Sequence, residues 1–243
     1  MRGGAGRRNE PYPLGQFPDS LLFEIAKQIV HRLAIGHSDI TGDDFGTIFA
    51  QAVHGIHRGR PLGIADVEHN GCAWSVKTIK TKNADLSSVR IARLISGRNS
   101  PDYSLGISNP RANPDNTGRA VLSVWNARVN EAMDQYDDLR IVAMIRNMET
   151  RDFLIFEEEG HRFTATSYRW EFNKSGNLEG FNRATGEHEF TWQPHGSQFT
   201  IKRQIPASAR RFTINPNIPI VQPESILAAI RFREDWVTIH GQV

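Results

Sequence analysis

Residues 61–80 read PLGIADVEHNGCAWSVKTIK, and this stretch decides the fold that we expect. At its centre, Asn70-Gly71 is the strongest short-range signal for a two-residue type I′ hairpin turn, because both turn positions require a positive φ. A turn at that place sets the register of the two strands, so that Asp66 lies opposite Ser75. The stretch therefore predicts a β-hairpin whose strands extend on both sides of the turn.

Side chains in a strand point alternately to its two faces, so the register also sorts the residues of the hairpin. The polar face carries Asp66, Glu68, Ser75 and Lys77. The opposite face is apolar and suits a core, with Ala65, Val67, Trp74 and Val76. Burying such polar groups costs on the order of several kcal/mol unless they are paired or bind a metal. The pattern indicates either a chemical site or a surface hairpin in which Lys77 forms an ion pair with one of the acids.

Two amphipathic helices are predicted before the hairpin. Apolar residues with helical spacing follow residues 18–20 and end near residue 33. A second apolar stripe follows Thr41 and Asp43, either of which can cap the helix, and stops before Gly59.

The remaining elements predict a mixed α/β (α+β) fold. After the hairpin we expect a helix over about 85–96, a short strand over 103–107, a longer helix ending near 136, and strands over 139–146 and 152–157. The part from residue 160 is β-rich and is closed by a helix over 223–233 and a short strand over 236–239. We divide the chain into a mobile basic arm (1–17), a core (18–158) and a β-rich part (159–243), the last two being compatible with one compact domain.

Composition limits the class of protein. The chain has 243 residues, of which 39% are apolar and 23% charged, as in an ordinary soluble globular protein. No apolar run approaches the roughly 20 residues that cross a bilayer, and the basic start lacks the apolar segment of a secretory signal. Cys72 is the only cysteine, which excludes an intrachain disulfide and a cysteine-built zinc site. That usage fits a reducing cytoplasm.

Charge is small in total and uneven along the chain. The formal net charge is +2, but residues 196–212 carry four basic side chains and no acid, a local charge of +4. Residues 131–159 carry nine acids against three arginines, a local charge of −6. Such segregation can make one face attractive to phosphates, although a solvated charged face would produce the same pattern.

The hairpin resembles the PD-(D/E)XK nuclease motif, in which an Asp ends one strand and an acid-x-Lys lies on the next. Asp66 matches the first Asp, with Ala65 in the usual proline position. Ser75-Val76-Lys77 matches the second half in the serine form known among type II restriction endonucleases.

The order of elements over residues 18–158 also agrees with the core of this family: helix, strand, strand, short strand, helix, strand. The resemblance implies a restriction-endonuclease-like core, a mixed sheet flanked by helices. In the serine form the missing carboxylate comes from a Glu about a dozen residues past the Lys, where this chain offers only Arg90. The family often recruits a Glu from a preceding helix, so Glu24 is our first candidate and Glu68, on the polar face of the hairpin, is the second.

The activity implied by the resemblance is Mg²⁺-dependent, sequence-specific hydrolysis of phosphodiesters in double-stranded DNA. Asp66 and one of the two Glu residues would bind the metal together with the carbonyl of Val76, since Mg²⁺ prefers oxygen ligands. Lys77 would hold the attacking water or stabilise the phosphorus at the transition state, whereas Ser75 is too weak a ligand to replace a carboxylate. We also expect a homodimer on a palindromic site and a cognate DNA methyltransferase in the host.

Arginine and amide side chains in the β-rich part are candidates for reading bases, because Arg pairs with guanine and Asn or Gln with adenine in the major groove. The base-reading candidates are Arg169, Lys174, Asn177, Arg183, Gln193, His195, Gln198, Lys202 and Arg203. The phosphate-contact candidates are Arg58, Arg60, Arg210 and Arg211. Alternating polar residues on an exposed sheet face would look similar.

Other interpretations of the sequence remain open. His69-Asn70 is a fragment of an HNH-type nuclease pattern, but the second His and the zinc-knuckle context of that class are absent. The missing second acid favours a DNA-binding protein with a decayed nuclease fold. A DNA repair nuclease on the same core is a third alternative.

Overall fold

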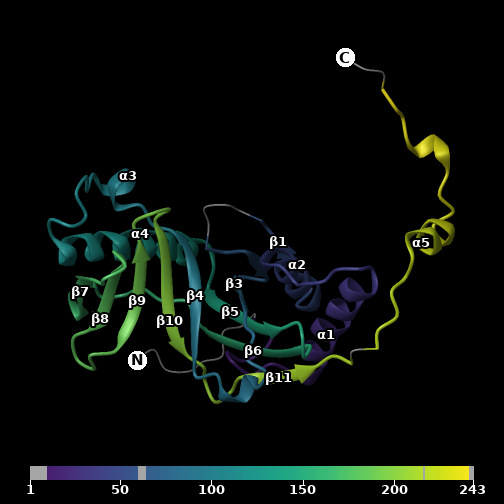
Figure 1. Ribbon diagram of the computed structural model, residues 1–243, viewed down its shortest axis with the longest axis horizontal. Helices are drawn as coiled ribbons and strands as arrows, with labels where there is room; N and C mark the ends of the chain where they lie inside the picture. The colour runs from purple at the N-terminus through teal and green to yellow at the C-terminus, as the bar shows by residue number, and fades with distance from the viewer. Residues whose placement is uncertain (1–9, 60–63, 216, 241–243) are drawn as a thin grey trace.

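The computed structural model describes residues 10–59, 64–215 and 217–240 (Figure 1). Its α-helices are α1 (Asp19–Ala34), α2 (Gly42–Ala52), α3 (Pro101–Leu105), α4 (Pro114–Gln135) and α5 (Pro223–Ala229). The strands are β1 (Ile56–His57), β2 (Val67–His69), β3 (Cys72–Lys80), β4 (Ile91–Arg98), β5 (Asp138–Asn147), β6 (Asp152–Glu159), β7 (Tyr168–Phe172), β8 (Leu178–Asn182), β9 (His188–Gln193), β10 (Gln198–Gln204) and β11 (Arg210–Thr213). The predicted mixed α/β class with a β-rich second half is confirmed.

The first sheet has the strand order β1-β2-β3-β5-β6-β11. Its pairs are antiparallel except β3 with β5, which run parallel because α4 crosses over between them. One face of the sheet packs against α1 and α2 through a core that includes Ile25, Phe49 and Trp74. The other face packs against α4 through a second core that includes Trp125 and Ile141. The sheet thus lies between two helical layers (Figure 1).

The second sheet has the order β4-β10-β9-β8-β7, and its strands are antiparallel. Its inner face carries Phe190, Phe199 and Trp192, which belong to the same core as Trp125 of α4. The helix α4 is therefore shared by the two sheets (Figure 1). Since β4 comes from the first half of the chain and pairs with β10, the catalytic core expected over 18–158 contributes a strand to the β-rich part.

Helix α4 and the second sheet meet at a close contact between a glycine and an indole. A Cβ placed on Gly118 would lie 2.1 Å from the Trp170 ring, far inside van der Waals distance. The Trp170 ring is 5% exposed and stacks on Phe190 at 5.7 Å, so it has little room to move. Asp115, in the first turn of α4, accepts a hydrogen bond from the Trp170 backbone N–H at 2.8 Å. These contacts fix β7 against the start of α4.

Two elements predicted between the hairpin and α4 are wrong. The helix expected over 85–96 is instead the short 3-10 helix Leu86–Ser88 followed by β4, because that segment pairs with β10 and its side chains alternate between exposed and buried. The strand expected over 103–107 is α3, a single turn that begins with Pro101 at its first position and ends at Gly106, whose φ is 68°. Pro at the start and Gly past the end are the usual asymmetric signals of a helix.

The two ends of the chain also differ from expectation. The mobile arm predicted over 1–17 does not extend over residues 10–17, because Tyr12 and Phe17 are buried at 6% and 3% exposure in the core beneath α1 and α2. The strand predicted over 236–239 is absent from the described residues, which have the 3-10 helix Glu234–Trp236 there. No helix in the described ranges has both the length and the apolar character needed to cross a membrane.

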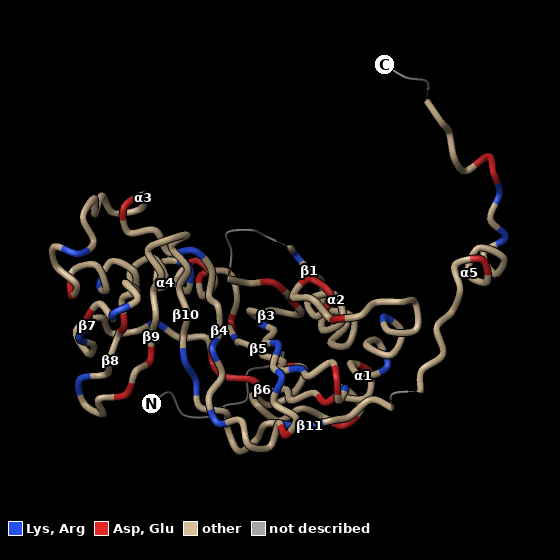
Figure 2. The backbone as a smooth tube through the Cα atoms, viewed as in Figure 1, with Lys and Arg blue, Asp and Glu red and all other residues tan. Residues whose placement is uncertain are grey.

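Figure 2 shows basic and acidic residues interspersed along the backbone, and ion pairs in the fold partly balance the uneven charge of the sequence. Arg203 of the +4 segment bonds to Glu158 of the −6 segment at 2.9 Å. Within the −6 segment, the fully buried Arg140 bonds to Asp138 at 2.6 Å and to Glu157 at 3.2 Å. These paired charges are internal, so the segregation along the chain does not translate directly into a charged surface.

We predict that Gly118→Ala destabilises the protein, although alanine is the better helix former by roughly 1 kcal/mol. The added methyl group would collide with the Trp170 ring, and overpacking of a core typically costs about 1–3 kcal/mol or more. Gly42→Ala is the matched control, because a Cβ there meets only Thr78 Oγ1 at 3.8 Å, an ordinary contact. Denaturant midpoints of both variants measure the effect, and equal midpoints would contradict the close packing.

Candidate active site

The hairpin forms with the predicted turn and register. Asn70 and Gly71 have φ angles of 47° and 81°, the left-handed conformation that a type I′ turn requires. His69 pairs with Cys72, and Glu68 pairs with Ala73, as the sequence predicts. The parallel partner β5 lies on the other side of β3, so the hairpin is built into the middle of the first sheet.

Asp66, Ser75 and Lys77 converge at the base of the hairpin. The Oδ2 atom of Asp66 accepts a hydrogen bond from the Val76 backbone N–H at 2.7 Å and lies 3.4 Å from Ser75 Oγ. The Lys77 ammonium lies 3.5 Å from the same oxygen and 3.2 Å from the Val76 carbonyl. Ser75 is fully buried, whereas the side chains of Asp66 and Lys77 are 25% and 19% exposed. The cluster therefore borders solvent on one side and the core on the other.

The two oxygens of the Asp66 carboxylate have different surroundings. All the hydrogen bonds of the Asp66 carboxylate use Oδ2, and Oδ1 has no such partner among the residues that the structure describes. Since the Asp66 side chain is 25% exposed, this oxygen is available to a cation or a water molecule. Among the described residues, no three or more His, Cys, Asp or Glu side chains form a ready metal cage.

One predicted orientation in the hairpin is wrong. Ala65 was expected to share the apolar face of Val67 and Trp74, but it packs against the core on the α4 side of the sheet. The strict alternation ends before β2, because the Asp66 N–H bonds to the Trp74 carbonyl and Val67 is the residue that pairs with Trp74. This slip of one residue gives Asp66 its bond to the Val76 N–H.

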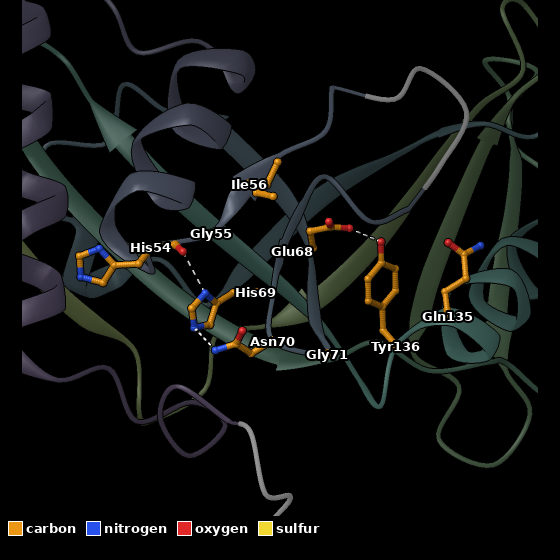
Figure 3. Close-up of a pocket in the computed structure, with 9 residues that line it drawn as sticks. All are labelled: His54, Gly55, Ile56, Glu68, His69, Asn70, Gly71, Gln135 and Tyr136. Atoms are coloured by element: carbon orange, nitrogen blue, oxygen red, sulfur yellow. Dashed lines mark hydrogen bonds between the residues drawn. The ribbon is translucent and has the colours of Figure 1, made fainter.

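Glu68 lies two residues beyond Asp66 and is held by two partners. Its carboxylate forms an ion pair with Arg58 and accepts a hydrogen bond from the Tyr136 hydroxyl. Figure 3 shows Glu68 and Tyr136 facing each other in a pocket of about 350 Å³, which the turn residues and His54 also border. Val67 faces α1 and α2, so Glu68 is on the opposite face of the sheet, the one that carries Ser75 and Lys77.

Glu24, the first candidate for the second carboxylate, lies on the other side of the first sheet. It lies on α1, which packs on the Trp74 face of the sheet, opposite to Ser75 and Lys77. Its carboxylate accepts hydrogen bonds from Lys27 at 2.6 Å and Gln28 at 3.0 Å on its own helix. The hydrogen bond from Lys27 and that from Gln28 lower the pKa of Glu24. The structure thus gives Glu24 no described contact with the hairpin cluster.

His69 and Asn70 have a structural explanation. The Nδ1 atom of His69 lies 2.9 Å from the His54 carbonyl, and its Nε2 atom lies 2.9 Å from Asn70 Nδ2. Both ring nitrogens are therefore engaged by the turn and by the end of α2 (Figure 3). These contacts connect the hairpin turn to the end of α2. They give His69 and Asn70 a structural role in place of the HNH interpretation.

Four of the base-reading candidates lie on the outer face of the second sheet. They alternate with the buried aromatic residues of β7, β9 and β10, and they are Arg169, Gln193, Gln198 and Lys202. Gln193 and Gln198 are directly opposite each other on neighbouring strands. Arg169 lies over the Phe181 ring at 4.4 Å, and Lys202 contacts His188 at 2.6 Å. Burial and the nearby Lys202 charge lower the pKa of His188.

Three further candidates lie in turns at one end of that sheet. Lys174 and Asn177 belong to the β7–β8 turn, and His195 belongs to the β9–β10 turn. Both turns connect strands at the same end, because the strands run antiparallel. The β4 strand also ends there, since Arg98 pairs with Gln198.

The other predicted DNA contacts are engaged elsewhere. Arg183 bonds to Asp115 and the Tyr168 carbonyl, and Arg203 bonds to Glu158 with its guanidinium 5.0 Å from the Phe163 ring centroid. Both therefore have structural partners.

The described phosphate-contact candidates also have partners. At the far edge of the first sheet, Arg210 bonds to the Phe17 carbonyl and Asp19, and Arg211 lies 4.0 Å from Asp85. Arg58 pairs with Glu68, and Arg60 lies outside the described residues.

The sequence did not identify Tyr136 and Phe181 as site residues. Tyr136 directly follows α4, and its contact with Glu68 joins two positions far apart in the chain. Phe181 is half-buried on β8, and its contact with the Arg169 guanidinium comes from the pairing of β7 with β8.

No protein-family model matches the chain, and neither the curated proteins nor the solved structures that were searched contain a significant match.

Proposed function

We propose that this chain is a Mg²⁺-dependent nuclease that hydrolyses double-stranded DNA at a specific sequence, as a type II restriction endonuclease does. The observation that carries the proposal is the convergence of Asp66, Ser75 and Lys77, with Lys77 Nζ and Ser75 Oγ within 3.5 Å of one Asp66 oxygen. The order of helix, hairpin, crossover helix α4 and parallel strand β5 supports it, because it agrees with the resemblance drawn from the sequence.

The residues present fit a Mg²⁺ ion held partly by water. Mg²⁺ usually takes one or two protein carboxylates and keeps several waters. Asp66 Oδ1 and the Val76 carbonyl would therefore hold the ion together with water molecules. When bound, the metal would supply Lewis-acid polarisation of a phosphate oxygen and a water of lowered pKa. Lys77 already lies beside Asp66 and the Val76 carbonyl. Its ammonium orients the attacking water and stabilises negative charge that develops on the phosphate.

Glu68 is the better candidate for the second carboxylate. It shares the face of Ser75 and Lys77, whereas Glu24 belongs to a helix on the opposite face. Its bonds to Arg58 and Tyr136 hold the carboxylate in place on that face. Tyr136 and Arg58 would then act as positioning residues for Glu68.

The outer face of the second sheet is our candidate for base recognition. Gln193 and Gln198 present two amide groups side by side, and Arg169 presents a guanidinium held over Phe181. Amides and guanidinium groups are the side chains that pair with adenine and guanine edges. Within this set Arg203 is paired with Glu158, Arg183 with Asp115 and Arg169 with Glu171, so each of these arginines would exchange an acidic partner for DNA.

A DNA-binding protein with a decayed nuclease fold is the second candidate. It is favoured by the bond from the Val76 N–H to Asp66 Oδ2, which gives this carboxylate a structural role directly before β2 begins. One experiment distinguishes the restriction enzyme from the binding protein. The chain is incubated with bacteriophage DNA and Mg²⁺, and the products are run on a gel. Discrete fragments support the restriction enzyme, a smear indicates a non-specific nuclease such as a repair enzyme, and intact DNA that is retarded on the gel supports the binding protein.

We predict that Asp66→Asn and Lys77→Met each reduce cleavage roughly 100-fold or more, the order expected when one group that stabilises the transition state is lost. Asp66→Asn is preferred to Asp66→Ala because an amide oxygen can still accept the bond from the Val76 N–H. Specific DNA binding in Ca²⁺ should survive in both variants. Lys80→Met is the matched control, since Lys80 lies on the same strand and pairs with Asp39. Cleavage at the unaltered rate by either site variant would disprove this assignment.

For the second carboxylate, we expect Glu68→Gln to lower cleavage by orders of magnitude and Glu24→Gln to leave it nearly unchanged. Glutamine keeps an oxygen for the Tyr136 hydroxyl but loses the charge that a metal requires. Single-turnover cleavage rates over a Mg²⁺ titration are the measurement. The reverse result would assign the role to Glu24, and full activity in both variants would exclude the metal geometry proposed here.

Base recognition by the outer face of the second sheet predicts that its variants lose affinity for cognate DNA and keep their affinity for random DNA. Gln193→Ala and Arg169→Ala should weaken binding to cognate DNA by about 1–3 kcal/mol each and leave binding to random DNA nearly unchanged. Gln204→Ala is the matched control, because Gln204 lies at the other end of β10 and contacts Glu187. Binding curves at two salt concentrations measure both affinities. Equal losses on both DNAs would mean that this face contacts only the backbone.

A further inference from the structure

Residues 219–240 form an apolar segment that leaves the body of the protein, and we call it the C-terminal arm (Figure 1). The last residue before it, Ile218, still packs against the core beneath α1 and α2. Within the arm, one described backbone bond reaches the body, from the Val221 N–H to the Ala34 carbonyl at 2.7 Å. The other described backbone bonds of the arm are internal to it.

The arm exposes far more apolar surface than a free segment tolerates. Nine large apolar side chains lie in it with exposures from 38% to 92%: Ile220, Val221, Ile226, Leu227, Ile230, Phe232, Trp236, Val237 and Ile239. Contiguous exposed apolar surface of this kind marks an interaction site. The arm therefore needs a partner that covers it.

The same chain carries an apolar groove of about 580 Å³ between α1 and β11. Its apolar wall consists of Leu22, Phe23, Ala26 and Val30 of α1 with Phe212 and Ile214. Phe23 is 73% exposed although it lies in the middle of a helix that packs on the core. Strand β11 is the last in the order of the first sheet, so one of its edges also borders open space.

We propose that the arm of one copy of this chain docks in the α1–β11 groove of a second copy, and that the second arm docks reciprocally. The charges at the groove rim are paired within the body, Arg210 with Asp19, Lys27 with Glu24 and Arg211 with Asp85. The apolar wall of the groove and the apolar side chains of the arm therefore carry this pairing.

Length and symmetry support the same occupant. The arm spans 22 residues from 219 to 240, and a stable interface uses roughly 20–30 residues on each side. Reciprocal docking about a two-fold axis buries both arms and both grooves and leaves no unpaired copy of either. The chain continues away from its own groove after the Val221–Ala34 bond, which favours a second copy over docking in its own groove. This inference does not rest on the proposed nuclease activity.

The experiment measures molar mass by light scattering over a wide concentration range, without DNA or metal. The unaltered chain should have twice its mass of 27.4 kDa. The double variant Phe232→Glu/Trp236→Glu, with a polar arm, and the groove variant Ala26→Glu should each have the mass of one chain. Tyr103→Glu is the matched control, because Tyr103 is a 94% exposed aromatic residue on α3, far from the groove (Figure 1).

Mixing the two monomeric variants separates exchange from self-docking. The groove variant still has an intact arm, and the arm variant still has an intact groove, so the mixture should form a heterodimer through one of the two contacts. A mixture that stays monomeric, together with a monomeric unaltered chain, would show that the arm docks on its own chain or on another protein and would overturn the proposal. A dimer that persists in both variants would place the interface elsewhere and would also overturn it.

Discussion

The structure depends on a buried ion cluster around Arg140. Its guanidinium is fully buried and bonds to Asp138 and Glu157, and a buried cation is tolerated only when such partners surround it. Burial raises the pKa of Glu157, and the charge of Arg140 opposes that rise. Glu157 also accepts hydrogen bonds from Trp74 Nε1 at 2.7 Å and from the Tyr12 hydroxyl at 3.0 Å. One carboxylate thus fixes β3, β5, β6 and the segment before α1 against each other.

This constraint determines which side chains of the hairpin can do chemistry. Because Glu157 holds the Trp74 ring on the face of α1 and α2, its neighbour Ser75 must point to the opposite face, and Lys77 follows two residues later. Asp66 then reaches the same place from the other strand through its bond to the Val76 N–H. The polar cluster is therefore a consequence of backbone pairing and of one buried aromatic contact, and it needs no flexible loop to assemble.

The parts of the fold that the sequence predicted are those controlled by local rules. The Asn70-Gly71 turn and the period of two were enough to place Ser75 and Lys77 on one face, and the turn register brought Asp66 to them although the alternation ends before β2. The helix expected over 85–96 was wrong because Ile91, Leu94 and Ile95 have helical spacing, while pairing with β10, more than a hundred residues later, decides the structure. The same limit applies to Arg203 among the candidate base readers: its partner Glu158 belongs to a different sheet, and a sequence alone does not distinguish a neutralised arginine from one that faces DNA.

Helix α4 connects the two halves of the proposed mechanism. Near its start, Gly118 and Asp115 hold β7 of the second sheet through Trp170, and just beyond its end Tyr136 bonds to Glu68 beside the hairpin. Energetic coupling between distant sites requires a contiguous set of packed groups with more than one arrangement, and a helix packed at both ends supplies the contiguous part. Through these contacts Glu68, the proposed second carboxylate, is joined to the second sheet by one packed helix, whereas the described side-chain bonds of Asp66 and Lys77 are to each other and to Ser75 and Val76 of β3.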